Sequence, residues 1–135
     1  MSRIVVDASV TVSWVLDDEF DPLAYAAMHR VDRDGGIVPQ MWHYEVHNSL
    51  LIAERRGRSS INVTQDGLDR IRGLRIISDR ETDFQATLDL ARAHRLSFYD
   101  ALYLELALRR NSLLATLDRA LARAATSFGL LLTTS

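Results

Sequence analysis

Short apolar runs alternate along this sequence with longer segments of helical periodicity. The runs at 3–7 (RIVVD), 74–77 and 113–116 carry the aliphatic residues typical of buried strands, and 37–38 and 130–132 predict two shorter ones. Strands separated by helices normally pair in parallel, because the crossover returns the chain to the same end of the sheet. The pattern therefore predicts an α/β fold with a mainly parallel sheet.

Polar caps and glycine stops mark the helices between these runs. We expect helices at 9–16, 22–33, 40–56, 63–72, 98–110 and 119–127, and one more that begins at Thr82. Asp21 before Pro22 is a clear start signal, since proline suits the first helical position. Ser9 and Ser97 are expected to cap their helices in the same way.

Two of the helices have faces that predict their packing. The 98–110 helix is apolar on nearly all sides, so it should be buried. The helix that begins at Thr82 is expected to turn Phe84, Leu88 and Ala91 toward the core.

Composition excludes several classes of function. The 135 residues fit one domain, expected to span 1–135, and contain no cysteine, which excludes disulfides and thiolate chemistry. Lysine is absent and the net charge is −2, so a polyanionic substrate would have to be met by arginines or by bound cations. No apolar stretch reaches the ~20 residues of a membrane span and no signal peptide is evident, so a cytoplasmic location is expected.

Four carboxylates stand at the ends or beginnings of the expected elements. Asp7 ends the first strand, and Asp118 follows the 113–116 strand. Asp100 lies in the first turn of the buried helix, and Glu45 shares a helix face with Trp42. Functional groups gather beyond the carboxyl ends of parallel strands, so these four side chains are expected to converge.

Each acid also has an ordinary structural explanation. Asp118 can cap its helix, Asp100 completes a Ser-x-x-Asp pattern, and Asp7 can begin a turn. Glu45 is harder to explain, because an unpaired carboxylate on an inward face would cost several kcal/mol. Helix capping accounts for the acids one at a time and leaves Glu45 unexplained.

A convergent set of four acids would need a counter-charge, and no lysine is present to supply one. Oxygen ligands of this kind suit Mg²⁺ or Mn²⁺ rather than Zn²⁺. A carboxylate-held Mg²⁺ can activate water, orient a phosphate and shield charge on the leaving oxygen. The acids therefore predict phosphodiester hydrolysis.

Four segments resemble, in order and spacing, the motifs of PIN-domain ribonucleases, specifically the VapC-type toxins of bacterial toxin–antitoxin pairs. They are 4–9 (IVVDAS), 38–46 (VPQMWHYEV), 96–103 (LSFYDALY) and 114–121 (LATLDRAL). Each contains one of the four acids, and together they extend over most of the chain.

This resemblance implies a three-layer α/β/α sandwich and a Mg²⁺-dependent endoribonuclease, with Mn²⁺ as a possible substitute. Asp7, Glu45, Asp100 and Asp118 would be the catalytic metal ligands, and the hydroxyls of Ser9 and Thr116 would support them. The resemblance further implies an RNA substrate, products with 5′-phosphate and 3′-hydroxyl ends, a homodimer, and a VapB-like antitoxin that blocks the site.

Other classes of function fit the sequence less well. His43 and His47 have zinc-ligand spacing but do not form HExxH, so we expect surface or partly buried histidines. A receiver would need a lysine, which is absent, and a haloacid-type phosphatase would need Asp-x-Asp directly after the first strand, where Asp7 is followed by Ala8-Ser9. A non-catalytic PIN-like interaction module, in which the acids are structural, remains the alternative.

The sequence predicts the roles of the arginine clusters and aromatic residues less specifically. The clusters at 55–58, 70–72 and 109–110 are expected to be solvated helix faces and ends, and we hypothesise that one of them contacts RNA backbone. The aromatic residues are expected in or near the core, with an antitoxin-binding groove as the alternative. They are Trp14, Phe20, Trp42 and Tyr44.

Overall fold

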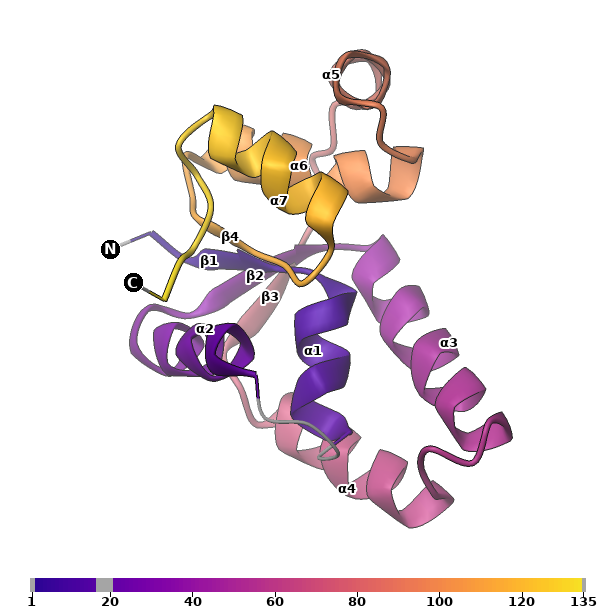
Figure 1. Ribbon diagram of the computed structural model, residues 1–135. Helices are drawn as coiled ribbons and strands as arrows, with labels where there is room; N and C mark the ends of the chain where they lie inside the picture. The colour runs from indigo at the N-terminus through magenta and orange to yellow at the C-terminus, as the bar shows by residue number, and fades with distance from the viewer. Residues whose placement is uncertain (1, 17–20, 135) are drawn as a thin grey trace.

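The structure is a computed structural model, which describes residues 2–16 and 21–134. Its centre is a parallel sheet with the strand order β3-β2-β1-β4 (Figure 1). The strands are β1 (Ile4–Val6), β2 (Gly36–Pro39), β3 (Ile76–Asp79) and β4 (Leu114–Ala115). The predicted α/β class with a parallel sheet is confirmed.

Helices cover both faces of this sheet. They are α1 (Ala8–Val15), α2 (Pro22–Asp34), α3 (Met41–Arg55), α4 (Ile61–Arg72), α5 (Phe84–His94), α6 (Phe98–Arg110) and α7 (Arg119–Ser127). In Figure 1, α1 to α4 lie on one side of the sheet and α5 to α7 on the other, which gives the expected three layers. Among the described residues no helix is both long and apolar enough to cross a bilayer.

β1 forms the buried centre of the sheet, with Val5 and Val6 fully inaccessible to solvent. It pairs with β2 on one side and with β4 on the other. The edge strand β3 begins two residues later than predicted, because Gly36 pairs with Ile76 and the ladder continues to Asp79. This shift places an acidic residue at the end of a strand.

The strand predicted at 130–132 is wrong in extent. This segment forms a single parallel bridge, between Leu114 and Leu131. Two hydrogen bonds make the bridge: Leu114 N–H donates to Leu130 O at 2.7 Å, and Leu132 N–H donates to Leu114 O at 2.9 Å. Because β4 is only two residues long, it offers no longer ladder for the segment to join.

The predicted helix caps are correct at two positions and wrong at one. Asp21 accepts hydrogen bonds from the first turn of α2, with Pro22 at its start, and Ser97 accepts one from the N–H of Asp100. Helix α1 is capped by Asp7 rather than Ser9: the Asp7 carboxylate accepts from Val10 N–H at 3.1 Å. β1 ends at Val6, so the helix begins earlier than expected and Ser9 falls inside its first turn.

The predicted inward face of α5 is also wrong. Phe84 is 66% exposed and Leu88 37% exposed, whereas Thr87 is buried. Helix α5 projects from the body and packs mainly on α6 (Figure 1), so it has little core to face. Phe84 instead stacks on Phe98, with ring centroids 6.2 Å apart.

Glycine 67 explains how α4 fits against α1. It is buried within α4, and a Cβ atom at this position would lie only 2.4 Å from Cγ1 of Val15. The glycine lowers helix propensity by about 1 kcal/mol relative to alanine, but it allows the two helices to approach closely.

Candidate active site

The candidate site lies where the sheet order changes direction. The chain proceeds from β1 to β2 and β3 on one side and then crosses to β4 on the other, so the carboxyl ends of β1 and β4 form a switch point. Hydrogen bonds join these two ends: Asp7 N–H donates to Ala115 O at 3.2 Å, and Leu117 N–H donates to Ser9 Oγ at 2.9 Å. Residues more than a hundred positions apart therefore share one pocket edge.

Asp7 is buried at this point, with 4% of its surface exposed. Its Oδ1 accepts hydrogen bonds from the hydroxyl of Ser9 at 2.7 Å and from Val10 N–H, and its Oδ2 accepts one from the hydroxyl of Thr116. Burial raises the pKa of Asp7 to about 6, although these hydrogen bonds lower it; the charge of Asp100 adds to the rise. Ser9 and Thr116 thus both contact the acid that they were predicted to support.

Glu45 lies half-buried on α3 and has a partner that the sequence did not reveal. The hydroxyl of Tyr103, on α6, donates to Glu45 Oε1 at 2.5 Å. Burial raises the pKa of Glu45, the hydrogen bond from Tyr103 lowers it, and the negative charge of Asp100 raises it further. The carboxylate that helix capping could not explain is held by a neutral donor.

Asp100 and Asp118 stand at the beginnings of α6 and α7. Burial raises the pKa of Asp100, and so does the charge of Asp118, while the hydrogen bond with Ser97 lowers it. Asp118 caps α7 by accepting from Leu121 N–H at 2.8 Å, and its own N–H donates to Thr116 Oγ1 at 3.0 Å. The capping explanation is therefore correct for Asp118, whereas Asp7, which was expected to begin a turn, is also a helix cap; neither finding excludes a further role.

Electrostatic interactions connect the four acids, with Asp100 in the middle. The charge of Asp100 raises the pKa of both Asp7 and Glu45, and the charge of Asp118 raises that of Asp100. Of the ion pairs formed between described residues, none involves these four. In residues 2–16 and 21–134, however, no three acidic or histidine side chains form a group that could hold a metal ion as they stand.

The donor set still suits a hard divalent cation. Every candidate ligand is a carboxylate oxygen, and the acids raise one another's pKa without an arginine to neutralise them. Mg²⁺ usually keeps several waters and binds through one or two carboxylates, so it does not require three at contact distance. The residues present therefore fit such an ion chemically, although the complete shell predicted from the sequence is not formed.

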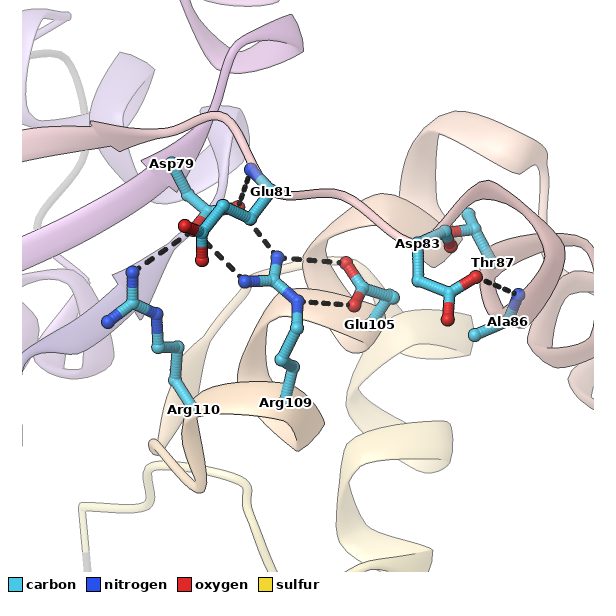
Figure 2. A network of polar contacts seen from close by, with 8 residues as sticks. All are labelled: Asp79, Glu81, Asp83, Ala86, Thr87, Glu105, Arg109 and Arg110. Atoms are coloured by element: carbon cyan, nitrogen blue, oxygen red, sulfur yellow. Dashed lines mark hydrogen bonds and ion pairs between the residues drawn. The ribbon is translucent and has the colours of Figure 1, made fainter.

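A second group of acids, Asp79 and Glu105, is instead paired with arginine (Figure 2). Asp79, buried at the end of β3, accepts two hydrogen bonds from the Arg109 guanidinium, at 3.0 and 2.6 Å, and one from Arg110 at 3.2 Å. Arg109 also donates to Glu105 at 2.7 Å from Nε. The hydrogen bond with Arg109 holds the pKa of Asp79 below its usual range.

This network adds to the expectation for the 109–110 cluster. Both arginines are exposed at the end of α6, as expected, but both are also paired with Asp79, which the sequence did not predict. Glu105 and Arg109 have the i, i+4 spacing of a helical ion pair, which is the one signal that the sequence offered. The network fixes the end of β3 to α6, the helix that carries Asp100 and Tyr103.

The two histidines of α3 are occupied by hydrogen bonds. His43 is partly buried with Nε2 2.6 Å from Ser78 Oγ, and His47 is exposed with Nδ1 2.6 Å from the carbonyl oxygen of His43. Their positions confirm the expectation of surface or partly buried residues.

The prediction that the aromatic residues lie in or near the core is partly correct. Trp42 is buried and donates to Thr11 Oγ1 at 2.9 Å, and the partly buried Trp14 donates to Ala24 O at 2.8 Å. Tyr44 was expected near the core, but it is 71% exposed, because it points away from the buried Trp42–Val46 face of α3. Phe20 lies outside the described residues.

Tyr44 instead lines an open groove of about 530 Å³. Two of the lining residues, Tyr44 and Tyr99, immediately precede Glu45 and Asp100 in the chain. We name the groove the aromatic groove; its apolar lining is formed mainly by Met41, Tyr44, Phe84, Phe98, Tyr99 and Leu102.

Comparisons with known proteins agree with this architecture. The family model of the PIN domain matches residues 4–126. The crystal structure of PAE2754 from Pyrobaculum aerophilum is similar, with a TM-score of 0.70 and 22% identity over 91% of this chain and 79% of that one, which shows a shared fold. No curated protein sequence matches the chain. PIN domains are generally metal-dependent nucleases. The chain belongs to the PIN-domain family.

Proposed function

We propose that the protein is a Mg²⁺-dependent endoribonuclease that acts as the toxin of a toxin–antitoxin pair. One observation carries the proposal: Asp7 is buried at the switch point of the sheet, coupled to Asp100, and in no ion pair formed between the described residues. Family membership supports nuclease activity in general. The choice of RNA, and the toxin role, rest on the likeness of the four sequence motifs to VapC-type toxins.

Asp7, Glu45, Asp100 and Asp118 would hold the Mg²⁺, with Mn²⁺ as a substitute. When bound, the ion would supply an activated water, orientation of the scissile phosphate and shielding of charge on the leaving oxygen. The hydroxyls of Ser9 and Thr116 hold one oxygen each of Asp7, which fixes the plane of that carboxylate. Hydrolysis would leave a 5′-phosphate and a 3′-hydroxyl.

Purified protein and total RNA provide the direct test. We expect cleavage in Mg²⁺, no cleavage in excess EDTA, and recovery when Mn²⁺ is added back. A single-stranded DNA of matched sequence serves as the control for substrate class. Cleavage that persists in EDTA would show that the acids are not the source of the activity.

The non-catalytic interaction module keeps some support from two observations. Asp7 and Asp118 both have structural roles as helix caps, and the aromatic groove exposes large apolar side chains. On this alternative, replacing a cap by a residue that caps equally well would have no effect on any activity. Asp118 allows that comparison.

Asp118→Asn should separate capping from metal binding. Asparagine caps a helix about as well as aspartate, so we expect the free energy of unfolding to change by less than about 0.5 kcal/mol. Cleavage should fall by more than about 10-fold, because an amide is a poorer ligand for Mg²⁺ than a carboxylate. Urea denaturation and RNA cleavage are measured side by side. Asp118→Ala is the matched control, with an additional loss of about 1 kcal/mol in stability.

We place the proposed homodimer contact on the aromatic groove. Its lining of methionine, tyrosine and phenylalanine is the composition found in the cores of protein interfaces. Tyr44→Glu should shift the protein from dimer to monomer in sedimentation equilibrium, because it introduces a charge into an apolar contact. Ile61→Glu, at a side chain that is 68% exposed on α4, is the control. An unchanged dimer in Tyr44→Glu would exclude the groove.

The antitoxin remains a proposal that rests on the resemblance alone. A small VapB-like protein would bind the toxin in the cytoplasm and cover the acids. Co-expression with the product of a neighbouring short reading frame, followed by co-purification and inhibition of RNA cleavage, tests this part separately from the nuclease activity.

A further inference from the structure

The hydroxyl of Tyr103 lies between two of the acids. Its side chain is among the largest that are fully buried, with 1% of the residue exposed. The hydroxyl donates to Glu45 Oε1 at 2.5 Å. Burial raises the pKa of Tyr103, and the hydrogen bond to Glu45 and the charges of Glu45 and Asp7 raise it further. Tyr103 therefore contacts α3 from α6, close to the end of β1.

Glu45 needs such a partner because of what surrounds it. Its carboxylate is half-buried, and the charge of Asp100 opposes its own. A glutamate side chain has three rotatable bonds, so repulsion from Asp100 would favour conformers that turn the carboxylate toward solvent. The hydrogen bond from Tyr103 holds it on the side of the other acids.

The chemical nature of the donor is important. An arginine would also hold a carboxylate, as Arg109 holds Asp79, but it would neutralise the charge. A tyrosine hydroxyl remains neutral and leaves the negative charge available. Tyr103 can therefore orient Glu45 without competing electrostatically with a cation.

We propose that Tyr103 is a positioning residue that holds the Glu45 carboxylate in the orientation required to bind a divalent cation. This inference rests on the proposed function, and it adds a residue to the site that acts through Glu45 rather than by contact with the ion. It is analogous to the outer hydrogen bonds that orient metal ligands in other proteins.

Tyr103→Phe removes only the hydroxyl and keeps the buried ring. We expect the dissociation constant for Mn²⁺, measured by electron paramagnetic resonance titration, to rise by about 10-fold. The Mg²⁺ concentration for half-maximal RNA cleavage should rise by a similar factor, while the rate at saturating Mg²⁺ falls less. Tyr25→Phe is the control, since Tyr25 is an exposed tyrosine on α2.

A double-mutant cycle makes the test specific. If Tyr103 acts through Glu45, Tyr103→Phe should weaken Mn²⁺ binding little or not at all in a Glu45→Gln background. Additive losses would contradict the inference, and so would a variant with a lower melting temperature but unchanged Mn²⁺ affinity. If Tyr103→Phe leaves the Mn²⁺ affinity unchanged while Asp7→Asn abolishes Mn²⁺ binding, only the role of Tyr103 is overturned. A wild-type protein that binds no Mn²⁺ would overturn the proposed function as well.

Discussion

Asp7→Asn should give a folded protein whose RNA cleavage is reduced by more than about 100-fold. Loss of an outer hydrogen-bonding partner of a metal ligand typically costs about 10–100-fold, so loss of a ligand charge itself should cost more. Asparagine can still cap α1 by accepting from Val10 N–H, so the fold should persist. The measurement is the rate of cleavage of a labelled RNA at saturating Mg²⁺, with circular dichroism to verify folding.

Asp89→Asn provides the matched control for this substitution. Asp89 is an exposed acid on α5, with Oδ1 3.8 Å from Nη1 of Arg92. Its replacement by asparagine removes the same negative charge as Asp7→Asn does. Its variant should cleave RNA at the wild-type rate. If Asp7→Asn cleaves within a few-fold of wild type, the assignment of the site is wrong and the interaction module becomes the better explanation.

In EDTA, the protein should lose about 2.4 kcal/mol of stability between pH 4 and pH 7 because of Asp7. The pKa of this carboxyl is about 6 in the folded protein, against the ordinary aspartate value of 3.8 that applies to the unfolded chain. Between these values only the unfolded chain releases the proton, so a rising pH favours unfolding. Each pH unit between the two pKa values is worth about 1.4 kcal/mol. This contribution is fully present below pH 3.8 and is lost as the pH rises through about 6.

Comparison with Asp7→Asn isolates this effect from the other acids. The raised pKa values of Glu45 and Asp100 act in the same direction, whereas the lowered pKa of Asp79 acts in the opposite one. The free energies of unfolding of wild type and variant are measured by urea denaturation at each pH. Their difference should therefore give the contribution of Asp7 to the pH dependence of stability. Added Mg²⁺ should stabilise the wild type above about pH 6 and have little effect on the variant. Parallel pH curves for the two proteins would contradict the prediction.

Much of the fold could be predicted because its strands are short, apolar and separated by helices. The predictions that failed concern features that depend on contacts between distant segments of the chain. The start of β3 is set by its pairing with β2, and the exposed face of α5 follows from how little of the protein it touches. Ser9 and Asp7 are both good capping residues, and only the end of β1 decides between them.

The four acids could be singled out from the sequence, and the family resemblance also implied a supporting role for Thr116. The contact between Tyr103 and Glu45 was not predicted, because 58 residues of sequence separate the two and no local pattern indicates it. Asp79 shows the converse. In the sequence it is one more acid at the end of a strand, like Asp7, and only the fold shows that Arg109 and Arg110 neutralise it.

Because Asp7 and Asp118 each cap a helix, they would be maintained for stability even in a descendant without the proposed nuclease activity. Losing such a cap costs about 1 kcal/mol, which is enough for selection to oppose it in a marginally stable domain. Glu45 caps no helix, and its burial next to Asp100 raises its pKa. Among descendants of this protein, position 45 should therefore change before positions 7 and 118 if the proposed activity is lost, and a survey of inactive forms should begin there.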